Sequence, residues 1–354
     1  MAPTSLTAAN TYTGGTVVNG GFTYTGILAL NVAGANAGST VAIPAGDLII
    51  NGATVRLDAA SQIHASVFPE IRGAGALSLN NFNQTLAGLS FVNEGSTTAA
   101  SVTTGTGILT LTGNITASSS NVGSVAVISG AGATVAGAGG TIALDLGGAT
   151  RTFNISPVTV NGNTTVANAT PSLAVSAPIG SSTDNATVGI TKSGNGLLQL
   201  SGANEFAGGL AVQGGGIVLG ANSTPSQGGV GFTGSPLGGA GVTMAAGTTL
   251  VVNNSDRTVG NTLTFAGTPV FDNTGSGAMR TLTLNSTLNG LATGATPIQI
   301  NSPWLTVALL GKIPNIASIT SFNRTGLGRL IFNATGYTGD FNATAPGLPT
   351  ALSL

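Results

Sequence analysis

Short apolar runs separated by glycine-rich segments fill residues 192–219 and restrict the folds open to this chain. The runs are Leu197–Leu200, Leu210–Val212 and Ile217–Leu219. Runs of this length between turn residues favour β-strands over helices. Glycine adopts positive φ without a steric penalty from a Cβ atom, so the chain can turn between the runs. The segment is therefore predicted to form a coil of β-strands.

The first part of this segment recurs as Gly-x-Gly-x-Leu-x-(Leu or Phe), called the head motif below. Its copies span residues 73–79, 105–111, 194–200 and 326–332. Their starts differ by 32, 89 and 132 residues, and the last two values are near multiples of about 22, a length typical of stacked repeats. A cation precedes three copies: Arg72, Lys192 and Arg324. We expect the copies to be equivalent units of one coil.

A second part, called the tail motif, follows the head at Ala203–Gly209. It recurs at Ala9–Gly15 and, in degenerate form, at Gly336–Gly339. The combined segment KSGNGLLQLSGANEFAGG resembles the autotransporter-associated β-strand repeat, Lys-x-Gly-x-Gly-x-Leu-x-Leu-Ser-Gly-x-Asn-x-(Tyr or Phe)-x-Gly-Gly. The good matches are residues 6–21 and 192–219, and the partial ones are 72–79, 105–113 and 324–339. This resemblance implies a right-handed parallel β-helix in the passenger of a bacterial surface protein, and it brings no catalytic residues.

We accordingly predict an all-β fold, one elongated right-handed parallel β-helix (a β-solenoid) that spans residues 1–354. At roughly 20–25 residues per layer, the chain would form about 14–18 layers. Residues 221–240 contain two prolines and many glycines, which indicates a loop or an internal boundary. Residues 297–314 differ in character and are expected to form a cap, an insertion or a short helix. Residues 95–144 carry no ionisable side chain until Asp145 follows; tight turns of the coil are preferred there over a low-complexity linker.

Composition limits the classes of function. Charged residues make up 5% of the 354 residues, and the net charge is −1. Nine scattered Lys and Arg residues form no basic patch, so no nucleic-acid partner is expected. No apolar run reaches the roughly 18 residues of a membrane-spanning helix. Cysteine is absent, which excludes disulfides and thiolate metal sites and is in keeping with an extracellular location.

Candidate catalytic residues are dispersed along the chain. Glycoside-cleaving β-helix enzymes need two carboxyl groups about 5–10 Å apart. Stacking of layers would bring Asp47 near Asp58 and Asp256 near Asp272, although turn and capping roles are the preferred interpretation. The other candidates are Asp145, Asp184, Asp340, Glu70, Glu94, Glu205 and the single His64. No catalytic set, metal site or cofactor site is predicted from them.

The predicted function is structural: a surface fibre subunit that assembles head to tail through its terminal half-repeats, as a homo-oligomer. One alternative is a monomeric adhesin or autotransporter passenger stalk that binds glycans or a host surface. A second alternative is a polysaccharide-degrading β-helix enzyme. Tyr12, Tyr24, Phe206 and Tyr337 are candidates for sugar contacts, although packing at the corners of the coil is the preferred role for them.

Overall fold

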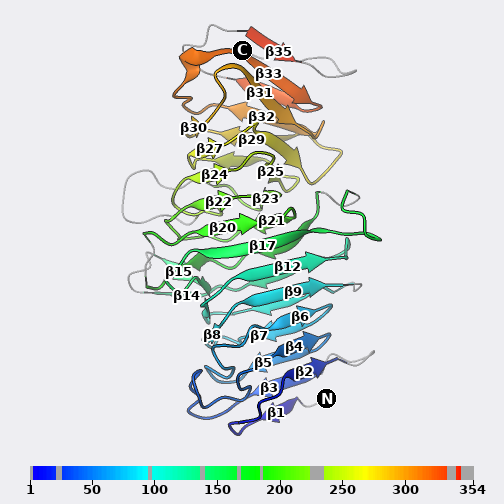
Figure 1. The fold of residues 1–354 in the computed structure, drawn as a ribbon, viewed down its shortest axis with the longest axis vertical. Helices are drawn as coiled ribbons and strands as arrows, with labels where there is room; N and C mark the ends of the chain where they lie inside the picture. The colour runs from blue at the N-terminus through cyan, green and yellow to red at the C-terminus, as the bar shows by residue number, and fades with distance from the viewer. Residues whose placement is uncertain are drawn as a thin grey trace.

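The chain folds into a stack of β-strand layers that rises from the N-terminus to the C-terminus (Figure 1). The computed structural model describes residues 3–20, 26–94, 98–135, 140–165, 169–183, 186–223 and 235–332, and the backbone of residues 340–343. Among the named strands of this part, every pair is parallel except one short hairpin. The predicted parallel β-helix is confirmed.

The first face is a 14-stranded sheet. Its strands are β1 (Thr4–Leu6), β3 (Ile27–Leu30), β5 (Thr54–Leu57), β7 (Ala76–Ser78), β10 (Ser101–Thr103), β13 (Ala126–Ser129), β18 (Pro171–Val175), β21 (Leu197–Leu200), β23 (Gly216–Leu219), β25 (Thr249–Val252), β28 (Val270–Asn273), β31 (Gly294–Ile300), β33 (Ile319–Gly326) and β35 (Asp340–Ala343). In the described part of the chain the sheet therefore has 14 layers, which agrees with the predicted range.

The second face is an 11-stranded sheet. Its strands are β2 (Thr16–Asn19), β4 (Leu48–Asn51), β6 (Glu70–Arg72), β9 (Leu89–Asn93), β12 (Ile115–Ser119), β17 (Arg151–Val158), β20 (Ile190–Ser193), β22 (Leu210–Val212), β24 (Val242–Met244), β27 (Leu263–Phe265) and β30 (Leu288–Asn289). A strand of the second face follows almost every strand of the first face along the chain, so the two sheets rise together.

The third face consists of two four-stranded sheets. The lower one contains β8 (Gln84–Leu86), β11 (Leu109–Leu111), β16 (Leu144–Asp145) and β19 (Ile179–Gly180), and the upper one contains β26 (Arg257–Val259), β29 (Arg280–Leu284), β32 (Leu305–Leu309) and β34 (Arg329–Phe332). The remaining elements are the antiparallel hairpin of β14 (Ala133–Thr134) and β15 (Thr141–Ile142) and the 3-10 helix η1 (Ile316–Ser318). Each complete layer thus runs from the first face through the third to the second.

Alternation along the strands separates the core from the solvent. In β9 and β12 every second residue is buried inside the coil, including Phe91, Ile115 and Ala117. Parallel pairing in register stacks equivalent side chains of successive layers on one another. One inward row of the second face runs through six layers: Ile115, Phe153, Lys192, Val212, Met244 and Phe265. Five of these six residues are apolar, so each layer buries apolar side chains against the layers on either side of it.

The head motif is explained by the way its two glycines meet the backbone of the layer below. The first glycine has positive φ in all four copies: 53° at Gly73, 62° at Gly105, 75° at Gly194 and 82° at Gly326. The second glycine lies directly on a carbonyl group; a Cβ atom at Gly196 would be 2.1 Å from the oxygen of Ser156. Gly75 and Gly107 have the same arrangement on Ile50 and Phe82. The motif therefore encodes a corner that only glycine permits at both positions.

The four head copies occupy two different corners, contrary to the expectation that they are equivalent units. The copies at 73–79 and 194–200 lead into β7 and β21 of the first face. The copies at 105–111 and 326–332 lead into β11 and β34 of the third face. The sequence distance between copies on different faces therefore does not correspond to a whole number of layers. The same local backbone geometry is required wherever the chain turns sharply over a lower layer.

Two segments, residues 297–314 and 221–240, were expected to depart from the regular layers. Residues 297–314 form neither a cap nor a short helix, because β31 and β32 pair within the first and third faces. β32 has all five residues buried, so its apolar run fills the core of an ordinary layer. The segment 221–240 lies largely outside the described residues, which end at Ser223 and resume at Ser235; the loop or boundary expected there stays a prediction, as does the single domain.

Candidate functional site

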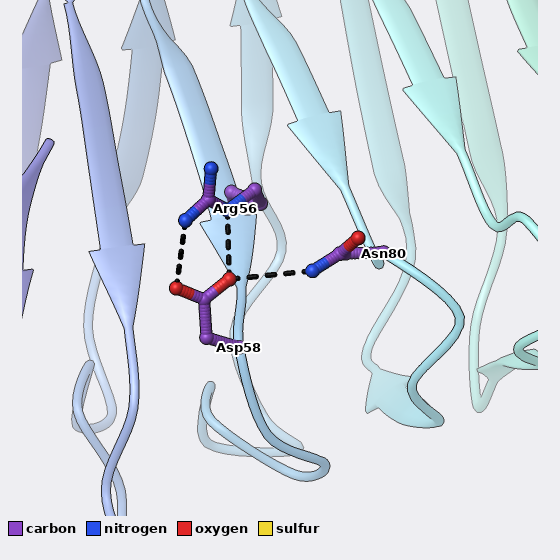
Figure 2. Close-up of polar contacts among 3 residues, drawn as sticks. All are labelled: Arg56, Asp58 and Asn80. Carbon is purple, nitrogen blue, oxygen red and sulfur yellow. Dashed lines mark hydrogen bonds and ion pairs between the residues drawn. The ribbon is translucent and has the colours of Figure 1, made fainter.

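The first predicted carboxylate pair is held apart by separate structural contacts. Asp58 follows β5 and accepts two hydrogen bonds from the Arg56 guanidinium, at 2.7 and 2.8 Å. Asn80 of the next layer donates a third bond at 3.3 Å, and Figure 2 shows the three side chains together. Arg56 lowers the pKa of Asp58 through these bonds. Asp47 instead precedes β4 on the second face, where its Cβ lies beside Gly15. Arg56 and Asp58 thus form an ion pair within one layer, and the Asn80 bond connects Asp58 to the next layer.

The second predicted pair is likewise divided between two faces. An Asp256 carboxylate oxygen accepts a hydrogen bond from the Thr281 amide at 2.8 Å, which places it at the start of the third face. Asp272 lies on β28 of the first face, where it accepts bonds from the Asn273 amide and the Asn301 side chain. Burial raises the pKa of Asp272. Both carboxylates fasten one layer to the next, which is the capping role that the sequence favoured.

Asp145 is the most enclosed of the described aspartates. Its carboxylate accepts four bonds: from the Thr110 hydroxyl at 3.1 Å, the Gly147 amide at 2.9 Å, and the Ser182 amide and hydroxyl at 3.1 and 2.5 Å. These partners come from three successive layers, because β11, β16 and β19 are neighbours on the third face. A carboxylate with this many donors binds neighbouring chain segments and has little capacity left for a ligand.

The other candidate residues are scattered over the coil. His64 contacts Ser66 and the Gly38 carbonyl, Glu70 pairs with Arg72, Glu94 is exposed, and Glu205 is buried, which raises its pKa. Asp184 lies outside the described residues, and of Asp340 only the backbone is described. Within the described part of the chain, no three His, Asp or Glu residues lie close enough to hold a metal ion.

The buried ammonium group of Lys192 forms the most distinctive polar site of the coil. Lys192 projects inward from β20, is 0% exposed, and lies between Phe153 and Val212 of the adjacent layers. Its Nζ atom donates hydrogen bonds to the carbonyl oxygens of Gly194 at 2.6 Å, Gly196 at 2.5 Å and Gly214 at 2.7 Å. All three ammonium donors are thereby satisfied. Burial lowers the pKa of Lys192 to about 8.

These three carbonyl groups come from two layers. Gly194 and Gly196 belong to the head motif of the Lys192 layer, and Gly214 belongs to the corner of the following layer. Carbonyl dipoles aimed at one cation stabilise the charge inside an apolar interior without a carboxylate partner. Lys192 therefore fastens two stacked corners together from the inside.

Arg324 repeats this arrangement at a different corner. It projects inward from β33, and its Nη1 atom donates to the carbonyl oxygens of Gly326 at 2.7 Å and Gly328 at 2.8 Å. Lys192 and Arg324 each stand two positions before the first glycine of a head motif, and each bonds the carbonyls two and four residues ahead. Arg72 stands one position before Gly73, so it points to the surface and pairs with Glu70 instead. A shift of one position in the sequence therefore separates a cation that bonds the corner carbonyls from one that lies at the surface.

The tail motif supplies a second kind of fastening through its asparagine. Asn204 is fully buried; its Oδ1 atom accepts a bond from the Ile179 amide at 2.9 Å, and its Nδ2 atom donates to the Pro236 carbonyl at 2.6 Å. Asn10, at the same place in the N-terminal copy, donates from Nδ2 to the Ala42 carbonyl at 2.8 Å. In both copies the acceptor lies 32 residues ahead, in the next layer.

Two segments of the chain thus present the same strands, corner and asparagine in the same places. β1 and β21 lie on the first face, β2 and β22 on the second, and an asparagine of the tail motif lies between the two strands in each copy. Residues 4–22 and 190–219 match the passenger-associated-transport-repeat family model. The match confirms the predicted resemblance to autotransporter-associated repeats and supports a passenger-like surface protein. Neither the curated proteins nor the solved structures yielded a match to this chain.

The passenger-associated-transport-repeat match, together with the stacked strands, indicates a surface or extracellular location. In the part of the chain that the structure describes, no helix has the length and apolar character needed to cross a membrane. The corner roles of Lys192 and Arg324 were missed from the sequence, although their common position before Gly-x-Gly was a usable signal. The Asn204 role was missed because its two partners lie in other layers.

Proposed function

We propose that this chain is a structural segment of an exported passenger, in which the β-helix acts as a stiff rod rather than as an enzyme. The observation that carries the proposal is the repeat match at two places where the coil has the same fastening between layers. Such fastening stiffens a coil along its axis, because each layer is bonded to the next by side chains as well as by strand pairing. Asp145, Asp256 and Asp272 also bond groups of neighbouring layers.

Two experiments test the rod proposal: imaging of the purified chain and determination of its location in the cell. Fourteen layers about 4.8 Å apart give a rod about 60 Å long, which negative-stain electron microscopy of the purified chain should show as straight particles of uniform width. In the source cells, external protease should remove an epitope tag placed in the exposed turn at Gly162 while a cytoplasmic marker remains intact. Globular particles, or a tag protected in intact cells, would refute the proposal.

End-to-end association into a filament is a finer proposal that the rod does not require. Its support is the low net charge of −1, which favours association, and the parallel sheets, whose edge strands offer unpaired backbone groups. Sedimentation velocity over a hundredfold concentration range separates the two: a filament-forming chain shifts to larger species, whereas an independent rod keeps one sedimentation coefficient.

A further inference from the structure

Three exposed apolar side chains lie just before successive strands of the third face, β29, β32 and β34, near the C-terminal end of the coil. Met279, Trp304 and Leu327 are 40%, 38% and 42% exposed. Arg280 pairs with Leu305, so Met279 and Trp304, which directly precede these residues, are neighbours. Leu327 lies between β33 and β34, at the corresponding corner of the next layer. The Arg280 amide bonds the Trp304 carbonyl at 2.8 Å, which fixes Met279 next to Trp304. We call these three residues the Trp304 ladder.

The Trp304 ladder stands on the corner that leads into the third face. Leu305, directly after Trp304, is buried in the core, so the tryptophan ring is directed outward by a backbone that is held firmly. It is the single tryptophan of the chain. Exposed apolar side chains that gather at one place, rather than singly, make that place a candidate binding site.

Two arginines lie next to residues of the Trp304 ladder: Arg280 directly follows Met279, and Arg329 pairs with Thr306, two residues after Trp304. Arg329 is exposed on β34, and the Arg280 side chain lies against Asn254 one layer below Met279. Asp256, whose carboxylate accepts a bond from the Thr281 amide, lies one layer below Met279. The ladder therefore has one arginine at its lowest layer and one at its uppermost layer, with the Asp256 carboxylate below them.

We propose that the Trp304 ladder binds an acidic polysaccharide. A sugar ring presents an apolar face that packs on an aromatic ring, and its carboxylates suit the bidentate donors of Arg329 and Arg280. The ladder is one side chain wide and follows the axis of the coil, so it suits a linear chain with one unit after another. Three half-exposed side chains are far short of the ~800 Å² per partner that a stable protein interface buries, which argues against a second copy.

The test uses the whole chain and three polymers: polygalacturonate, which is acidic and has sugar rings; dextran, which has rings without charge; and poly-glutamate, which has charge without rings. Biolayer interferometry should show binding to polygalacturonate that is stronger than to either of the others. Trp304→Ala should weaken it by about tenfold or more, as truncation of a central aromatic anchor does. Arg329→Gln should weaken it less and reduce its dependence on salt.

Leu310→Ala and Tyr12→Ala are matched controls, since both side chains are exposed but lie away from the ladder; neither should change binding. Leu327→Glu supplies a second variant, which adds a repelling charge without removing the tryptophan. Equal binding to poly-glutamate, or unchanged binding by both Trp304→Ala and Leu327→Glu, would overturn the proposal. So would a shift of the ligand-free chain from oligomer to monomer on Trp304→Ala, because the ladder would then be a contact between copies. The rod proposal survives each of these results.

Discussion

The Nζ atom of Lys192 lies 2.7 Å from the carbonyl oxygen of Gly214, a residue one layer further along the coil. This bond adds a side-chain link between two corners that are also joined by the backbone bonds from Gln213 to Lys192 and from Gly216 to Gly196. With the bonds to Gly194 and Gly196, it turns a glycine-rich corner, which would otherwise be among the softest parts of the coil, into a satisfied polar cluster. The charge sits in an apolar row because the surrounding backbone provides its counter-dipoles.

Replacing Lys192 by methionine should destabilise the coil. Methionine fills a similar volume but donates nothing, so the carbonyls of Gly194 and Gly214 lose their partner inside the protein. Buried acceptors without partners cost about 1–3 kcal/mol each, and we expect the free energy of unfolding in urea to fall by about 2–4 kcal/mol. Lys312→Met is the control, because Lys312 is exposed. Equal stability of the two variants would contradict the bonding role.

Stability should also rise with pH in an alkaline window. Burial lowers the pKa of Lys192 to about 8 in the folded chain, against about 10.4 for a free lysine. Between these values the unfolded chain binds more protons than the folded one, so the free energy of unfolding increases as the pH rises through the window. Urea unfolding at pH 7, 8, 9 and 10 measures this change. The rise should be absent in Lys192→Met, and a rise of the same size in both proteins would assign it to other groups.

A series of three glycine variants should separate steric contact from backbone strain. Gly196→Ala would place Cβ 2.1 Å from the Ser156 oxygen, which forces adjacent layers apart. Gly247→Ala meets nothing within 4 Å but has φ of 77°, and Gly14→Ala has neither problem. We expect losses of several kcal/mol, about 1–2 kcal/mol and close to zero, in that order, from thermal unfolding. A Gly196→Ala chain as stable as Gly14→Ala would show that the layers adjust freely.

Asn204 should matter more than its counterpart in the N-terminal copy. Asn204→Ala removes an acceptor for the Ile179 amide and a donor for the Pro236 carbonyl, both in the interior, and should cost about 2–3 kcal/mol. Asn10 is only partly buried and makes one comparable side-chain bond, so Asn10→Ala should cost about 1 kcal/mol or less. Denaturant midpoints of the two variants measure the difference. The reverse order would indicate that the first layer is held more firmly than the middle ones.

The repeat signature was sufficient to predict parallel layers, their approximate number and the glycine corners. These features depend on local conformation: short apolar runs extend, and Gly-x-Gly turns with positive φ at its first residue. Residues 297–314 were misjudged because their strand β32 is buried on both faces, and a short, mostly apolar run resembles a buried helix as much as a strand. The capping roles of Asp58 and Asp256 were anticipated in kind, but their partners Asn80 and Thr281 were not.

What the chain determined by itself is the form of each Gly-x-Gly corner, since glycine readily adopts the positive φ that the first position of every copy has. What only the tertiary structure decided is which corners meet. Successive strands of the first face are separated by 19 residues between Leu200 and Leu219 but by 47 between Ile128 and Val175. The segments between strands vary this much in length, so sequence spacing does not determine which residues become neighbours. Strand register decides that the Gly214 carbonyl meets Lys192 and which layers lie beside Trp304, and this register is set by stacking of the whole coil.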